Sequence, residues 1–201
     1  MLGPAHRREY GLRASTIAGA LGLRPAVAQI TEAEGELIER CSSGVRRVVQ
    51  IGVAEGGSAW HARRAMDPGG VLHLIDTYPT VLGLNLSSII AKRLLQSMPG
   101  AEVEWIRARS DEAVRSWSEP IDFLFIDGDH AYDAVRCDWE DWHRFIGPHG
   151  RVAFHDALLD APWMDESFGS ARFVAELIDV ERGWEVVDRA DSIAVLARAG
   201  E

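Results

Sequence analysis

Carboxylate and imidazole side chains follow two strand-like apolar runs, Ile121–Ile126 and Val152–Phe154, at the point where each run ends. In a parallel sheet the carboxyl ends of neighbouring strands meet at one edge, so we expect the two groups to converge there. Carboxylates suit a hard divalent cation such as Mg²⁺, and a neighbouring carboxylate or imidazole can accept a proton from a substrate hydroxyl. The residues concerned are Asp127, Asp129, His130, His155 and Asp156.

The same residues have a plainer interpretation, as solvated turn residues or as caps of a helix expected from Tyr132. One polar side chain is enough to cap a helix, whereas three carboxylates and two histidines stand here at two strand ends. We therefore interpret them as a group that does chemistry.

A glycine-rich turn joins the strand-like run Val48–Ile51 to a helix expected from Ser58. Gly52, Gly56 and Gly57 allow a tight turn and a close approach of the backbone to a ligand. The N–H groups that begin the next helix can receive a polar or anionic ligand end. The spacing does not match the GxGxxG pattern of dinucleotide-binding proteins. We favour a ligand-binding turn over a purely structural one.

Asp76 ends the next strand-like run, 24 residues after Gly52. An acid at this position of an α/β fold commonly accepts hydrogen bonds from a ribose diol. The alternative is a turn or helix-capping aspartate, because Thr77 and Tyr78 begin a loop. Together with the glycine turn, the position favours a nucleotide-like ligand.

Apolar runs of strand length alternate with helix-sized segments, which predicts βαβ units and a parallel sheet covered on both faces. The expected strands are Val48–Ile51, Val71–Ile75, Val103–Ile106, Ile121–Ile126, Val152–Phe154, Trp184–Val187 and Ile193–Leu196. The expected helices between and after them are Ser58–Met66, Ser87–Met98, Asp111–Trp117, Tyr132–Phe145 and Ala171–Val180. The last two strands form a hairpin-like pair, which would bring one antiparallel strand into the sheet.

The length of the chain fits one domain with a substantial core, and we expect a single domain over residues 1–201. Residues 1–44 are expected to form a helical extension, because residues 15–41 look helical and Thr31 opens a capping-box sequence. The amphipathic segment Ile17–Leu23 could pair with another subunit in a homo-oligomer or cover the chain's own active site.

Composition limits the partners of the protein. The net charge is −10, with no long basic run, which argues against nucleic acid and against an anionic membrane surface. No apolar run approaches the length of a membrane span, and the first residues lack the apolar core of a signal peptide. Cys41 and Cys137 have no metal-binding spacing, so we expect reduced thiols and a cytoplasmic protein.

With these motifs the sequence resembles the class I S-adenosylmethionine (SAM)-dependent methyltransferases. More narrowly, it is similar to the small metal-assisted O-methyltransferases that include macrocin-type enzymes of natural-product sugars. The resemblance extends from about Thr31 to Leu196. The segments that carry it are Gln50–Ser58, Leu74–Asp76, Phe125–His130 and Ala153–Asp156.

The resemblance implies a Rossmann-like, doubly wound α/β fold with a seven-stranded sheet in the order 3-2-1-4-5-7-6 and the last strand antiparallel. It places the methionine part of SAM at Gly52, the ribose at Asp76 and the adenine near Ser110. The full set of expected cofactor-binding residues is Gly52, Glu55, Gly56, Ser58, Asp76, Ser110, Asp111 and Asp127. It also implies that Asp127, His155 and Asp156 surround Mg²⁺, and that Asp129 or His130 takes the proton.

Three residues depart from the family pattern. Gln50 stands where an acid usually opens the glycine motif, so Glu55 is a candidate for binding the cofactor's amino group. Ala54 replaces a common glycine. His155 stands where some sugar enzymes have the first of two adjacent aspartates, which alters one metal ligand.

The sequence thus predicts an enzyme that transfers a methyl group from SAM to a hydroxyl of a small molecule or natural-product sugar, assisted by Mg²⁺. One alternative is a nicotinamide-dependent oxidoreductase, since the glycine turn and Asp76 would also suit a dinucleotide. Another is a cofactor-binding module without catalytic activity. The carboxylates at 127, 129 and 156 count against both.

Overall fold

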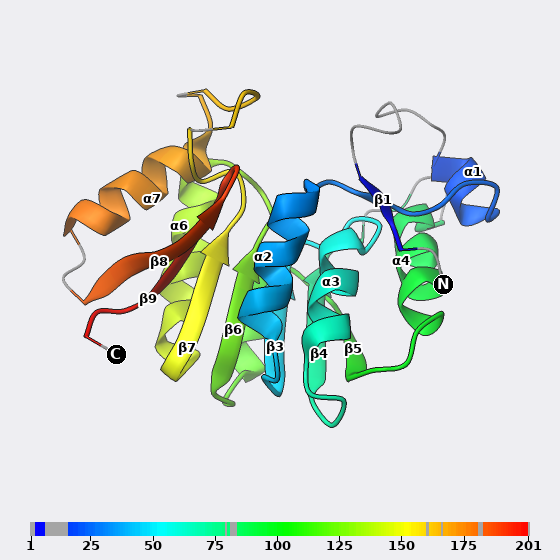
Figure 1. The fold of residues 1–201 in the computed structure, drawn as a ribbon, viewed down its shortest axis with the longest axis horizontal. Helices are drawn as coiled ribbons and strands as arrows, with labels where there is room; N and C mark the ends of the chain where they lie inside the picture. Colours follow the sequence, from blue (N-terminus) through cyan, green and yellow to red (C-terminus); the bar gives the residue numbers. More distant parts are fainter. Residues whose placement is uncertain are drawn as a thin grey trace.

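A seven-stranded sheet forms the centre of the molecule, with helices on both faces (Figure 1). The computed structural model describes residues 3–6, 16–78, 80, 84–159, 161–165, 167–180 and 183–200. The strand order is β5-β4-β3-β6-β7-β9-β8, with β9 antiparallel to both of its neighbours and the other pairs parallel. Numbered within this sheet, the order is 3-2-1-4-5-7-6, so the predicted Rossmann-like fold is confirmed.

The seven strands coincide with the seven predicted apolar runs. They are β3 (Arg47–Ile51), β4 (Val71–Asp76), β5 (Glu102–Arg107), β6 (Ile121–Ile126), β7 (Ile146–Phe154), β8 (Trp184–Ala190) and β9 (Ile193–Arg198). β7 begins earlier than predicted, at Ile146, which pairs with Ile121. The register of β6 and β7 shifts between Ile121 and Phe123, and such an irregularity lets the turn-like sequence Pro148–Gly150 lie within the strand.

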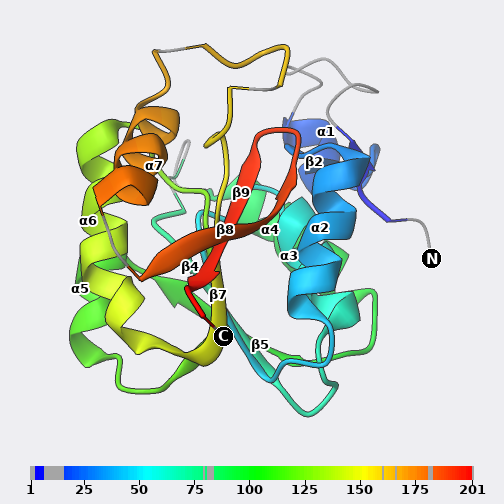
Figure 2. The same ribbon diagram turned by 60° about the vertical axis from the view of Figure 1, so that its left-hand side comes forward.

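The helices form one layer on each face of the sheet (Figure 2). One layer holds α2 (Glu32–Ser42), α3 (Gly57–Ala65) and α4 (Leu86–Gln96), and the other holds α5 (Ser110–Ala113), α6 (Tyr132–Trp142) and α7 (Gly169–Val180). The 3-10 turns η1 (Val114–Ser116) and η2 (His143–Phe145) follow α5 and α6. None of the helices in the described part of the chain combines the length and apolar character needed to cross a membrane.

Each helix layer packs on the sheet through its own apolar cluster. On α6 the buried residues Val135, Trp139 and Trp142 recur at helical spacing, so one stripe of the helix faces the sheet. Helix α2 contributes Leu37 and Ile38 to the opposite cluster. The sheet is therefore buried on both faces, and only the ends of its strands are available to a ligand.

The N-terminal segment is helical only in part, whereas residues 15–41 were expected to be largely helical. Helix α1 (Thr16–Ala20) is followed by a two-residue strand, β2 (Val27–Ala28), which pairs in parallel with β1 (Ala5–His6). Gly22 ends α1: its φ is 77°, and the N–H of Leu23 donates to the carbonyl oxygen of Ala18, as in a glycine cap. Thr31 then caps α2 in the predicted capping box.

The exits of β3 and β6 approach each other at Gly52. Its backbone has a φ of 84°, in the left-handed region that favours glycine. A Cβ atom at this position would lie 2.0 Å from the carbonyl oxygen of Asp127. No side chain fits there, so this glycine is required by the packing of the two strand exits.

We expect Gly52→Ala to lower the free energy of unfolding by roughly 2–5 kcal/mol, because it adds a backbone clash to an unfavourable φ. Gly44→Ala is the matched control: Gly44 also has a positive φ, of 69°, but a Cβ there meets nothing within 4 Å. Urea unfolding of both variants measures the difference. Equal losses would show that the contact with Asp127 is unimportant.

Candidate functional site

Backbone hydrogen bonds hold the exits of β4, β3, β6 and β7 side by side. Each donor N–H belongs to the residue that follows its strand. The bonds run from the N–H of Gly52 to Ile75, of Asp127 to Ile51 and of His155 to Ile126, with N···O distances of 2.9, 2.9 and 3.0 Å. These bonds fix where the side chains that follow each strand begin. The two acidic groups at the ends of β6 and β7 are therefore brought together, as the sequence predicts.

A cleft of about 840 Å³ opens at this edge of the sheet. This volume lies in the usual range for a small-molecule site. Most of the predicted site residues line it, namely Gly52, Glu55, Ser58, Asp76, Ser110, Asp111, Asp127, Asp129 and His130. Gly56, His155 and Asp156 are not among the lining residues: Gly56 caps α3, and the other two lie buried at the exit of β7.

The glycine turn is braced by two polar side chains. The buried amide of Gln50 donates to the carbonyl oxygen of Gly52 at 2.7 Å and to the hydroxyl of Ser58 at 2.8 Å. One carboxylate oxygen of Asp76 accepts the N–H of Val53 at 2.9 Å. Gln50, which replaces the expected acid, thus holds the turn in shape.

Asp76 also accepts the N–H of Tyr78 at 2.6 Å through its other oxygen. A carboxylate offers about four lone-pair positions, so these backbone bonds leave acceptor capacity toward the cleft. Asp76 is half-buried and lines the cleft.

Glu55 is paired with Arg24 of the N-terminal segment. The two side chains form a bidentate salt bridge with distances of 2.7 and 2.6 Å, and Glu55 also accepts the N–H of Val27 at 2.8 Å. Ala28 packs so closely on the start of α3 that a Cβ at Gly57 would lie 2.4 Å from it. Glu55 therefore anchors β2 over the glycine turn, a role that the sequence did not predict.

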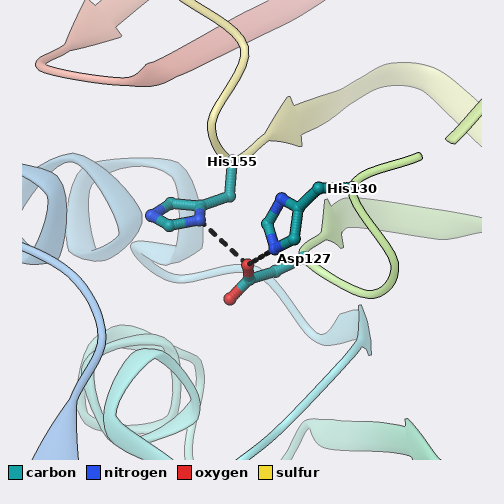
Figure 3. Close-up of side chains that lie close together, drawn as sticks. All are labelled: Asp127, His130 and His155. Atoms are coloured by element: carbon teal, nitrogen blue, oxygen red, sulfur yellow. Dashed lines mark ion pairs between the residues drawn. The ribbon is translucent and has the colours of Figure 1, made fainter. Parts of the chain in front are cut away.

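Asp127 lies between two imidazoles (Figure 3). Its Oδ1 is 2.9 Å from Nδ1 of His155 and 3.9 Å from Nε2 of His130. One ligand atom from each of the three side chains lies within 4.8 Å of the others. Oδ2 of Asp156 is 3.4 Å from Nδ1 of His130 and 3.6 Å from Nδ1 of His155. The predicted metal residues are thus joined by His130.

The donor atoms of this group fit a divalent cation. Nδ1 of His155 and Oδ1 of Asp156 are buried and make no hydrogen bond to any described residue. Buried polar atoms normally have a partner, and imidazole nitrogens with carboxylate oxygens form a common donor set for divalent metals. Asp156 has a φ of 49°, which is rare outside glycine and concentrates at functional sites.

The charges around His155 favour a cation at this point. Burial lowers the pKa of His155, but the carboxylates of Asp127, Glu34 and Asp156 beside the ring outweigh it and leave the pKa well above its usual value. A proton on the imidazole or a metal ion beside it would meet the same electrostatic demand.

The two predicted bases differ in position. Asp129 is exposed, and its Oδ1 accepts the N–H of Ala131 at 2.9 Å, as in a turn that leads into a helix. His130 is held by its backbone, whose carbonyl oxygen accepts the N–H of Ser170 at 3.1 Å. With 39% of its side chain exposed, His130 faces both the cleft and the acidic group.

Asp138 is a cleft residue that the sequence analysis missed. It is buried on α6, and the hydroxyl of Ser110 donates to it. Burial raises the pKa of Asp138 to about 6, although the hydrogen bond from Ser110 opposes the shift. The available signal was an aspartate inside the apolar stripe of α6, directly before Trp139. By contrast, Asp111 is half-buried and is paired with Arg109 at 2.8 Å.

We expect Asp138→Asn to stabilise the protein above pH 7 by about 2–3 kcal/mol, because the pKa is raised from 3.8 to about 6. A raised carboxyl pKa stabilises the fold fully below pH 4 and ceases to do so as the pH rises through 6. The advantage of the neutral variant should therefore vanish near pH 4. Urea unfolding between pH 4 and 8 measures it, with the exposed Asp133→Asn as control. A gain in stability that does not change with pH would contradict the raised pKa of Asp138.

Comparisons with known proteins identify the family. A family model described as a methyltransferase domain matches residues 49–157, which is more than half of the 201 residues. The uncharacterised protein R132 of Acanthamoeba polyphaga mimivirus is 29% identical over 113 residues, which are 54% of this chain and 50% of that protein. The chain therefore spans about half the length of the curated relative that it matches.

Solved structures share the fold at low sequence identity. A protein from Corynebacterium glutamicum has a TM-score of 0.69 at 16% identity, over 97% of this chain and 94% of its own. The O-methyltransferase TomG from Streptomyces achromogenes, in complex with SAM, has a TM-score of 0.65 at 17% identity, with 93% and 89% covered. An O-methyltransferase from Bacillus cereus, in complex with SAH, has a TM-score of 0.63 at 16% identity, with 96% and 94% covered. The resemblance inferred from the sequence is confirmed, and the chain belongs to the methyltransferase-domain family.

Proposed function

We propose that the protein transfers a methyl group from SAM to a hydroxyl of a small molecule, with a natural-product sugar as one acceptor class. The observation that carries this proposal is that one cleft is lined by the glycine turn, by Asp76 and by Asp127 with His130. A nucleotide-like ligand and a group able to bind a cation and a proton would then meet at one edge of the sheet. Two solved structures of similar fold, described as O-methyltransferases, hold SAM and SAH, which supports the same ligand here.

The cofactor would lie across the strand exits. Gly52 and Ser58 would contact the methionine part, and Asp76 would accept hydrogen bonds from the ribose hydroxyls. Ser110, with Asp138 behind it, would lie at the adenine. Glu55 would act indirectly, by holding the N-terminal segment against the turn through Arg24.

A divalent cation would be held by Asp127, His155 and Asp156. A bound cation would lower the pKa of the acceptor hydroxyl and orient its oxygen. Mg²⁺ prefers oxygen ligands, whereas an imidazole also suits Mn²⁺, Co²⁺ and Zn²⁺. The histidine that departs from the family pattern therefore favours one of these ions over the Mg²⁺ expected from the resemblance.

His130 would accept the acceptor's proton at Nε2. Its Nδ1 lies 3.4 Å from Asp156, whose charge would stabilise the imidazolium that forms. SAM would supply the methyl group: the hydroxyl oxygen would bond to the methyl carbon as the bond from that carbon to sulfur breaks, its electron pair remaining on sulfur to give S-adenosylhomocysteine. The chain's contribution is to hold the two reactants in line and to remove the proton.

Nothing in the site favours the nicotinamide alternative, because the glycine spacing departs from the dinucleotide pattern and the family is one of methyltransferases. A module without activity would have no use for buried atoms of His155 and Asp156 that make no hydrogen bond to a described residue.

We expect SAM to protect Cys137 from modification. Cys137 is exposed and lines the cleft, whereas Cys41 is buried and burial raises its pKa. A disulfide reagent such as DTNB should therefore modify one thiol rapidly in the native protein and both after unfolding. SAM should slow the first reaction, and NAD⁺ should leave it unchanged. If NAD⁺ protected Cys137 and SAM did not, the nicotinamide alternative would replace the methyltransferase proposal.

We expect His130→Asn to reduce methyl transfer 10²–10⁴-fold, the usual contribution of a general base, with SAM affinity retained. Asp129→Asn is the matched control and should stay near wild-type activity, because Asp129 faces solvent in a turn. Transfer from radiolabelled SAM to a panel of catechols and sugars provides the assay. If Asp129→Asn lost methyl transfer and His130→Asn retained it, Asp129 would be the base.

A further inference from the structure

Ser170 is a buried residue at the start of α7 that contacts the exits of two strands at once. Only 1% of it is exposed. Its N–H donates to the carbonyl oxygen of His130, beyond β6, at 3.1 Å. Its hydroxyl donates to the carbonyl oxygen of Asp156, beyond β7, at 2.5 Å. One residue therefore joins the backbones that carry the imidazole of His130 and the carboxylate that lies 3.4 Å from it.

The start of α7 rests directly on the turn that holds His130. A Cβ atom at Gly169 would lie 2.1 Å from the backbone nitrogen of Tyr132 and 2.8 Å from the carbonyl oxygen of His130. Further along the helix, the buried ring of Phe173 contacts the ring of Tyr132, with centroids 5.8 Å apart. The glycine and the apolar face thus dock the helix, and this docking does not need the hydroxyl of Ser170.

The hydroxyl holds a peptide group in an uncommon conformation. Asp156 has a φ of 49°, and a residue with a side chain keeps such a conformation only when its surroundings enforce it. Both polar groups of the peptide that follows Asp156 are bound. Its oxygen accepts the hydroxyl of Ser170, and its N–H, on Ala157, donates to the carbonyl oxygen of Ser192 at 2.7 Å. Loss of the first bond would let this peptide turn and carry the carboxylate of Asp156 with it.

Helix capping does not account for this hydroxyl. A serine near the start of a helix commonly accepts one of the free N–H groups of that helix. The hydroxyl of Ser170 instead donates to a carbonyl oxygen 14 residues earlier in the chain, at the exit of another element. Its bond therefore fixes the site rather than the helix.

We infer that Ser170 is a positioning residue for methyl transfer: it fixes the backbones of His130 and Asp156 relative to each other and so holds their side chains together. This inference rests on the proposed function. A displacement of about 1 Å in a site that aligns reactants can reduce the rate about 100-fold. Ser170 lies beyond residues 49–157, to which the family model extends.

A kinetic test compares two variants of the full chain, both on α7. Ser170→Ala removes the bond to the strand exit, so kcat should fall about 10–100-fold, while the KM for SAM stays within about threefold of the wild-type value. The acceptor is the catechol or sugar of the panel that the wild type methylates fastest.

Val174→Ala is the matched control. Val174 lies one turn after Ser170 and is 1% exposed in the apolar cluster that docks α7. Its truncation weakens the docking of the helix and leaves the hydroxyl in place. Tm should therefore fall at least as much as in Ser170→Ala, with kcat close to that of the wild type.

A second measurement needs no acceptor. In a crystal structure of Ser170→Ala, Asp156 should leave the left-handed region, and its carboxylate should move about 1 Å or more from the ring of His130. An unchanged Asp156, or an equal loss of kcat in Val174→Ala, would overturn the inference and leave the proposed function intact. A wild-type protein whose Cys137 is not protected by SAM would overturn the proposed function and the inference with it.

Discussion

The contact between the backbones of Gly52 and Asp127 is the constraint on which the site depends. It requires the exits of β3 and β6 to lie closer than any side chain at position 52 would allow. Because hydrogen bonds continue one residue past these strands, the same alignment extends outward to Ile75 and His155. The cleft, the glycine turn and the acidic group are consequences of that alignment, since each begins where a strand of the sheet ends.

Around this rigid edge, the N-terminal segment completes the walls. Arg24 reaches Glu55 over the glycine turn, and Glu34 faces His155 at the buried exit of β7. Both contacts come from residues that precede the first strand of the central sheet. The segment therefore belongs physically to the site, although the matched methyltransferase domain begins after it.

The sequence predicted the parts of the fold that arise from local pattern. Apolar runs separated by helix-sized segments predicted the seven strands, and the capping box at Thr31 was found as predicted. The convergence of Asp127 and His155 followed from their places at the ends of adjacent strands. These conclusions needed only chain periodicity and the geometry of a parallel sheet, whereas the order of the strands came from the resemblance to the methyltransferases.

What could not be predicted depends on the direction of single side chains over long sequence distances. The pairing of Glu55 with Arg24 leaves no periodic signal, because it joins one residue to a distant part of the chain. The segment expected to be helical over residues 15–41 is interrupted, because Gly22 ends α1 and the chain then pairs as β2. Asp129 and His130 are neighbours in sequence and both line the cleft, yet the turn before α6 leaves Asp129 exposed and brings His130 beside Asp156.

The hydrogen bonds between Glu34 and Ser192 join residues 158 positions apart. Contacts of such long sequence separation form late, since the entropy of closing the loop must be overcome before they are made. A conformation in which the hairpin of β8 and β9 is undocked would leave Glu34 with its bond from Thr31 but without the two bonds from Ser192. The surroundings of Glu34 beside His155 would thus be complete only when the two ends of the fold have met.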